Sequence, residues 1–205
     1  KMENIKRFFP EEENIDYTKL KLTEIGKYSI SKPTEADCIS NIIINTILKH
    51  SLGDPKKMTI TDATGGFGGN ILSFARHFRL VIGIEKHKVH YDILKNNVNV
   101  FNYGYKVNII HSSFIKIIPH VCKDVIFIDP PWGGKKYRFK KSVMLHLDQM
   151  DIFDIINQIP SETKLIALKI PFNFDYRKFI QNINPGYIIG NHKIKNYYLL
   201  IIVRH

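Results

Sequence analysis

A carboxylate, two prolines and an indole follow one another in the run Asp129-Pro130-Pro131-Trp132. Each proline fixes its own φ and biases the preceding residue toward an extended conformation, so Asp129 and the adjacent carbonyl groups should be rigid and point outward. Such acceptors can hold both N–H groups of an aromatic amine and turn its lone pair toward an electrophile. Trp132 offers a face for ring stacking, with a cation–π contribution of about 0.5–2 kcal/mol if the ring is cationic. The run predicts a site for an amino-bearing base, although a Pro-Pro turn with a core tryptophan is the plainer alternative.

A glycine-rich loop lies upstream of this run. Residues 58–62 predict a short strand, and four glycines between Gly65 and Gly69 separate it from an apolar-periodic helix. Glycines let the backbone pass close under a ligand, and the helix amino terminus offers unpaired N–H groups. Glu85 ends the next strand, 23 residues after Asp62, near the spacing at which an acid meets a ribose diol. Since the pattern is neither Gly-x-Gly-x-x-Gly nor a P-loop, it favours a nucleoside ligand over a dinucleotide or a triphosphate.

In this order the two motifs resemble S-adenosylmethionine-dependent methyltransferases, and within them the trimethylguanosine synthases, which methylate the 2-amino group of a 7-methylguanosine RNA cap. The glycine loop is similar to that family's cofactor loop, and Pro130 to Gly134 with Tyr137 is similar to its substrate loop. Residues 28–33 and 170–175 are similar to further family segments, so the resemblance runs from about Tyr28 to the end of the chain.

The resemblance implies S-adenosyl-L-methionine as cofactor and 7-methylguanosine-capped RNA as partner, with an in-line displacement governed by geometry and removal of water. The implied cofactor-binding residues are Asp62, Thr64, Gly65, Gly68, Asn70, Glu85, Ser113, Phe114 and Asp129. The implied catalytic residues are Asp129, Pro130 and Trp132, and the implied substrate-binding residues are Trp132, Lys135, Arg138 and Asn173.

Three positions depart from the family pattern. Asp129 replaces the usual serine and is more typical of amino methyltransferases that act on bases in DNA or ribosomal RNA. Ser112-Ser113-Phe114 replaces a Gly-Asp-Phe, so Ser113 offers the adenine only a neutral hydrogen bond. Gly65 replaces a cysteine. The alternatives are therefore an exocyclic-amino methyltransferase for an internal guanine or adenine, and a non-catalytic RNA-binding module that has lost the cofactor.

The charge of the chain favours a polyanionic partner. The net charge is +11, and five of the seven residues from Lys135 to Lys141 are basic. These residues directly follow the substrate loop, so a base held at Trp132 would have its phosphates near Lys135 and Arg138. The alternative is a solvated charge run.

The remaining composition predicts an intracellular protein of the cytoplasm or nucleus, and not a secreted one. Two cysteines among 205 residues are too few for a disulfide scaffold, and neither they nor the nine histidines have metal-ligand spacing, so no metal is expected. No apolar stretch approaches the ~20 residues of a membrane span. Residues 28–205 are predicted to form the methyltransferase domain, and residues 1–27 a leader that is either a loose tail or a small cap over the pocket.

Alternating hydrophobic patterns place these motifs on a fold. The prediction is an α/β, Rossmann-like methyltransferase fold: a mostly parallel seven-stranded sheet, helices on both faces and a C-terminal antiparallel hairpin. A helix over 34–49 is expected to cover the sheet edge. The other predicted strands are 58–62, 80–85, 107–111, 125–129, 164–170, 186–193 and 197–203, and the other predicted helices are 70–77, 88–100, 148–158 and 176–182, with a helix or turn up to residue 120.

Overall fold

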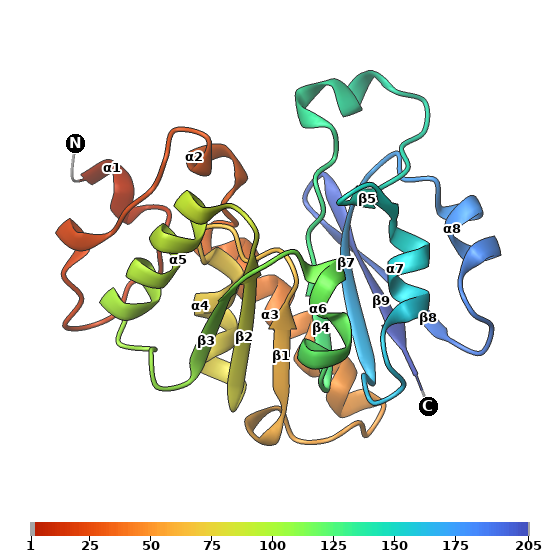
Figure 1. Cartoon of the computed structure of the whole chain (residues 1–205), viewed down its shortest axis with the longest axis horizontal. Coiled ribbons are helices and arrows are strands. Elements are labelled where there is room, and N and C mark those ends of the chain that lie inside the picture. The colour runs from red at the N-terminus through yellow and green to blue at the C-terminus, as the bar shows by residue number, and fades with distance from the viewer. Residues whose placement is uncertain (1–2, 205) are drawn as a thin grey trace.

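Seven strands among the described residues, 3–204, form one sheet in this computed structural model, in the order β3-β2-β1-β4-β7-β9-β8 (Figure 1). Strands β1, β2, β3, β4 and β7 pair in parallel, and β9 is antiparallel to both β7 and β8. The predicted sheet with its antiparallel C-terminal hairpin is confirmed. The strand bounds are β1 Thr59–Asp62, β2 Leu80–Glu85, β3 Val107–His111, β4 Val125–Ile128, β7 Leu165–Pro171, β8 Ile188–Ile194 and β9 Tyr197–Val203.

Helices cover both faces because the central strands are apolar on both sides. In β4, Ile126 and Ile128 belong to a core shared with α6, α7 and α8, whereas Val125 and Phe127 belong to a second core shared with α3, α4 and α5. Figure 1 shows α6 and α7 in front of the sheet and α3 behind it. The bounds are α3 Pro33–Lys49, α4 Gly69–His77, α5 Lys88–Val100, α6 Phe114–Val121, α7 Ile152–Gln158 and α8 Tyr176–Asn182.

Helix α3 covers a face of the sheet and not only its edge, which corrects the prediction. Ile39, Ile43 and Ile47 lie on one side of the helix at helical spacing and are fully buried in the core that contains Ile60 of β1 and Val125 of β4. The apolar stripe is wide enough to pack across central strands, and this placement buries more of its side chains than a position at the sheet edge would.

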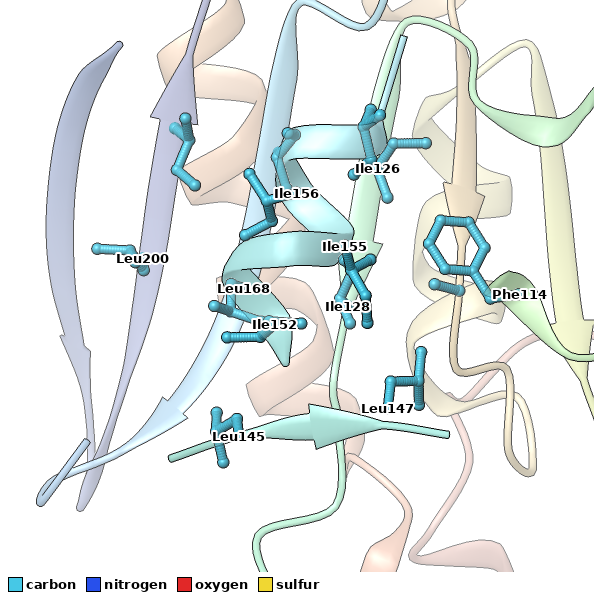
Figure 2. Packing of buried hydrophobic residues seen from close by; sticks show 14 of the residues in the cluster. Phe114, Ile126, Ile128, Leu145, Leu147, Ile152, Ile155, Ile156, Leu168 and Leu200 are labelled. Atoms are coloured by element: carbon cyan, nitrogen blue, oxygen red, sulfur yellow. The ribbon is translucent and has the colours of Figure 1, made fainter. Parts of the chain in front are cut away.

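A short hairpin precedes α7 and corrects the predicted helix over 148–158. Strands β5 His146–Leu147 and β6 Met150–Asp151 pair antiparallel around a turn in which Asp148 and Gln149 have φ of 49° and 67°. Helix α7 begins only after Asp151, whose carboxylate accepts the Phe153 N–H as an N-cap. Figure 2 shows α7 packed over β4 and β7, with the hairpin crossing its N-terminal end.

The parallel strands β1, β2 and β4 all end at the same edge of the sheet, where open α/β folds bind ligands. Residues 129–145 rise beyond this edge, at the top of Figure 1, and include the 3₁₀ helix η3 Gly134–Phe139. Strand β4 ends at Ile128, so Asp129 already belongs to this projecting segment. The fold thus brings the two sequence motifs to one end of the molecule.

The N-terminal segment is packed, and the loose-tail alternative is wrong for its described part. Phe8, Phe9 and Leu20 form a small core with Leu72 of α4 and Phe101 after α5. Its elements are α1 Glu3–Lys6, η1 Tyr17–Lys19 and α2 Gly26–Ser29, and η2 Pro55–Lys57 precedes β1. Within residues 3–204 there is no helix of the length and apolar content that crossing a membrane requires.

Candidate active site

A cavity of about 320 Å³ opens at the carboxyl edge of the sheet. Its wall combines the loop after β1, the end of β2, the start of α6, the segment after β4 and the hairpin before α7. The lining residues that the sequence predicted are Thr64, Gly65, Asn70, Glu85, Ser113, Phe114 and Asp129. Asp62, Gly68, Pro130 and Trp132, also predicted at the site, are outside this lining, whereas Pro131 is part of it.

The glycine loop depends on one left-handed residue and one close backbone approach. Gly68 precedes α4 with a φ of 99°, a left-handed conformation that favours glycine. A Cβ on Gly69 would overlap the carbonyl oxygen of Ser31, so only glycine lets this loop pass the segment ahead of α3. Gly69 lines the cavity, whereas Gly68 is outside the lining and sets the turn into α4.

Asp62 holds the loop together below the cavity. Its Oδ1 accepts hydrogen bonds from the Thr64 backbone N–H and hydroxyl, at 2.9 and 3.1 Å, and the same hydroxyl oxygen accepts the Asp129 N–H at 2.8 Å. Burial raises the pKa of Asp62 from 3.8 to about 7, against the hydrogen bonds from Thr64, with smaller contributions from the charges of Asp129 and Glu85. Asp62 thus links the two motifs and does not contact the cavity.

Glu85 presents a fixed carboxylate at the end of β2. Its two oxygens accept the Gly66 N–H at 3.0 Å and the His87 N–H at 2.8 Å, and the residue is 8% exposed. A carboxylate held from behind by two backbone donors keeps lone pairs for a diol in the cavity. This geometry fits the predicted ribose contact.

Asn70 provides a polar atom that fits a bound cofactor. Its Nδ2 donates to the Ser31 hydroxyl at 2.9 Å, while Oδ1 is buried with no hydrogen-bond partner among the described residues. Buried carbonyl oxygens are usually satisfied, so an unpaired one in a cavity wall is suited to a ligand donor such as an ammonium group. Together with Glu85, the residues present fit a nucleoside with an amino-acid tail.

Asp129 pairs with a lysine that the sequence analysis did not identify. Lys169 Nζ of β7 lies 3.3 Å from Asp129 Oδ2, with side-chain exposures of 11% and 24%. The same ammonium lies 5.6 Å from the ring centroid of Trp132 and 4.6 Å from that of Tyr197. Lys169 lies within a run of apolar residues on β7 whose pattern predicts a buried strand. Nothing in the neighbouring sequence therefore indicated Lys169 as a site residue.

Trp132 is a half-buried ring and not an open platform. It packs edge-on to Tyr137, with centroids 5.2 Å apart and planes at 76°, and its Nε1 is buried without a partner in the described chain. Lys169 lies over the ring, so the stacking face predicted from the sequence is already shared with a cation. Pro130, between Asp129 and Pro131, is buried, so only its backbone carbonyl group is considered for contact with a substrate.

The basic segment projects beside the aromatic group. Lys135 and Arg138 are exposed on η3, with Lys135 Nζ 5.5 Å from the ring centroid of Tyr28. Asn173 Nδ2 donates to the carbonyl oxygens of Tyr137 and Lys140, at 2.9 and 2.8 Å. Asn173, predicted to bind substrate, therefore holds the loop in place through its amide nitrogen.

Several lining residues were missed by the sequence analysis of the site. Ser29, Ile30 and Ser31 belong to a segment that resembled the family but received no site role. Ile30 and Ser31 lie close to Gly69, which brings this segment to the cavity. Asp148 comes from the hairpin turn, for which the sequence indicated a helix. In the part of the chain that the structure describes, no group of three His, Cys, Asp or Glu side chains could hold a metal ion.

The fold and the cavity at its carboxyl edge define a Rossmann-like methyltransferase. A precorrin-6Y C5,15-methyltransferase from Geobacter metallireducens superposes with a TM-score of 0.59 at 13% identity, over 91% of this chain and 94% of that chain. This likeness concerns the fold alone.

The sequence profile of the RNA cap guanine-N2 methyltransferase family matches residues 57–199, and the chain belongs to this family. It is 27% identical to an uncharacterized protein of Acanthamoeba polyphaga mimivirus, over 98% of this chain and 86% of that protein. It is 25% identical to a trimethylguanosine synthase of Schizosaccharomyces pombe, over 74% of this chain and 62% of that protein's length. The protein is an RNA methyltransferase, and S-adenosyl-L-methionine is its methyl donor.

Proposed function

We propose that this protein transfers methyl groups from S-adenosylmethionine to the 2-amino group of 7-methylguanosine in an RNA cap, forming a di- or trimethylguanosine cap. The observation that carries the proposal is that Asp129, directly before Pro130-Pro131-Trp132, lines the same cavity as Asn70 and Glu85, so that an amine held at Asp129 would face a cofactor bound there. Membership of the RNA cap guanine-N2 methyltransferase family supports this substrate class.

Each part of the cavity has a part of the cofactor to hold. Thr64, Gly65 and Asn70 would line the amino-acid tail, with Asn70 Oδ1 accepting from the ammonium group. Glu85 would accept the ribose hydroxyls, and Ser113 and Phe114 at the start of α6 would border the adenine. Asp62 and Gly68 would act through the shape of the loop.

The chemistry asks little of the protein beyond orientation. When bound, S-adenosylmethionine supplies an electrophilic methyl group on its sulfonium. Asp129 and the neighbouring carbonyl groups would accept the N–H groups of the substrate amine and turn its lone pair toward that methyl. Once methylated, the amine nitrogen would be cationic, and Asp129 or water would accept the one proton that it loses. Lys169 would hold the Asp129 carboxylate in the rotamer that this requires.

The aromatic and basic groups would bind the cap. Trp132 would stack on the guanine through the part of its ring that Lys169 leaves free, and the exposed Lys135 and Arg138 would contact phosphates. We assign residues 28–205 to the methyltransferase domain and residues 1–27 to an extension that shapes the cap site. Packing of this extension against α4 and Phe101, beside the cavity segment 29–31, supports that assignment.

One observation favours a second candidate. The Lys169 ammonium over Trp132 would repel a cationic 7-methylguanine, and Asp129 offsets that charge only through the ion pair. A neutral base would meet no such repulsion. The second candidate is therefore exocyclic-amino methylation of an internal guanine or adenine in ribosomal RNA, for which an aspartate before Pro-Pro is typical.

The test is methyl transfer from S-adenosylmethionine to 7-methylguanosine diphosphate and to guanosine diphosphate, with the product masses measured. The proposal predicts turnover of the 7-methylated substrate alone, and the masses count the methyl groups. Asp129→Ala should lower kcat by at least about 100-fold with cofactor binding retained. Trp132→Ala should weaken binding of the cap analogue while cofactor affinity stays unchanged, both measured by isothermal titration calorimetry.

The matched control is Phe139→Ala. Phe139 is an aromatic residue on the same segment, but it is 89% exposed and lies outside the ring group that Trp132 forms with Tyr137 and Tyr197, so cap affinity should not change. Turnover of neither diphosphate, with cofactor still bound, would refute the cap proposal and favour the internal-base candidate, which transfer to uncapped RNA would then establish.

A further inference from the structure

In the methyltransferases that this chain resembles, an acidic residue at the position of Ser113 lies against the adenine. Ser113 has only a hydroxyl group with which to form a hydrogen bond there. The structure brings a carboxylate to this position from another element. The Ser113 hydroxyl donates a hydrogen bond to Asp148 Oδ2, and Lys86 Nζ donates to Asp148 Oδ1. Asp148, Ser113, Lys86 and Phe114 all line the same cavity. The acid missing at residue 113 is thus present 35 residues further along the chain.

The hairpin before α7 fixes the position of Asp148. Leu147, the residue before it, is 8% exposed and belongs to the core that contains Phe114 and Ile128. Figure 2 shows Leu147 extending from the hairpin strand toward Ile128, with Phe114 beside it. Asp148 then enters the left-handed region with a φ of 49°, which aspartate tolerates better than most residues. The anchor on one side and the turn on the other direct Asp148 to the cavity wall.

The surroundings of Asp148 favour the ionised form. Burial raises the pKa of its carboxyl group, but hydrogen bonds from Lys86 and Ser113 and the nearby positive charges outweigh burial, so the pKa lies below its ordinary value. The side chain is 21% exposed, so it is neither locked in the core nor free in solvent. Two donors use two of about four lone-pair sites on the carboxylate, and the others remain for a ligand donor.

We propose that Asp148 is the residue that recognises the 6-amino group of the cofactor's adenine, in place of the acid absent at Ser113. A carboxylate accepts from an amino group but repels the 6-oxo group of a hypoxanthine, so Asp148 makes the cavity selective for adenosine over inosine. This inference rests on binding of the cofactor at this cavity and does not depend on which RNA is methylated.

The test is calorimetric binding of S-adenosylhomocysteine and of its 6-oxo analogue, S-inosylhomocysteine, to the whole chain. The wild-type protein should prefer the adenosine compound at least about 10-fold. Asp148→Asn should weaken binding of the adenosine compound about 10-fold and remove most of the preference, because the new amide can also donate to a 6-oxo group. Asparagine tolerates the left-handed turn, so the hairpin should persist.

Two further variants make the result specific. Asp148→Gly removes the carboxylate while glycine keeps the positive φ, and it should also lose the preference. Asp92→Asn removes an exposed carboxylate of α5 that is likewise paired with a lysine, and it should change neither affinity. An unchanged preference in both Asp148 variants would overturn the inference while leaving the cofactor assignment intact. Failure of the wild-type protein to bind S-adenosylhomocysteine would overturn the cofactor assignment itself.

Discussion

Replacing Asp62 by asparagine should make the stability of this protein less sensitive to pH. In the unfolded chain the Asp62 carboxyl is in water with a pKa of 3.8, and in the folded protein burial raises that pKa to about 7. Between these pH values the folded state binds more protons than the unfolded state. The free energy of unfolding therefore falls as pH rises from about 4 to about 7. Above that window Asp62 is ionised in both states, and its ionisation no longer changes the free energy of unfolding with pH.

The size of the effect follows from the two pKa values. At about 1.4 kcal/mol per pH unit, ionisation of Asp62 costs the folded state about 4 kcal/mol across the whole window, of which about 3 kcal/mol falls above pH 5. Asparagine has no charge to desolvate and keeps an oxygen that can accept from Thr64. Its extra N–H groups carry a fixed penalty of about 1–3 kcal/mol if unpaired, but that penalty does not vary with pH.

The assay is urea unfolding of wild-type and Asp62→Asn proteins at several pH values between 5 and 8, at constant ionic strength. The difference between the two free energies of unfolding should grow in favour of Asp62→Asn by about 3 kcal/mol as pH rises. Contributions from titrating groups that do not interact with Asp62 cancel in this difference. Asp92→Asn, at an exposed position, controls for the change in net charge. A difference that stays constant over this pH range would refute the assignment of a buried, protonated Asp62.

Two further predictions concern the substrate side of the site. Lys169→Met removes the partner of the Asp129 carboxylate, 3.3 Å away, and should lower kcat about 10-fold or more without changing the KM for the cofactor. Lys169→Arg should restore part of the loss, and an unchanged kcat of Lys169→Met in steady-state kinetics would argue against a positioning role. Asn173→Ala removes the two hydrogen bonds to the carbonyl groups of Tyr137 and Lys140, so trypsin should cleave the basic segment several-fold faster, and equal cleavage rates would show that these bonds do not hold the loop.

The repeating pattern of the chain was enough to predict the sheet and most of its helices. Strands such as β4 are apolar at every position, and helices such as α3 repeat apolar residues at helical spacing, because both elements bury large faces. Short motifs with strict backbone demands were equally readable: the glycine loop and Glu85 line the cavity, as does Asp129 ahead of its two prolines. These features depend on neighbours in sequence, which is why sequence alone determined them.

Contacts between residues that are distant in the chain could be determined only from the tertiary structure. Lys169 looks like one polar residue in a core strand until β7 pairs with β4 and brings it to Asp129. Asp148 lies in a stretch for which the sequence indicated a helix, but α7 begins only after Asp151. Burial of Leu147 in the core stabilises the hairpin that holds Asp148 instead. Local preferences differ by fractions of a kcal/mol per residue, whereas burying one large side chain is worth about 1.5–3 kcal/mol, so packing overrode them.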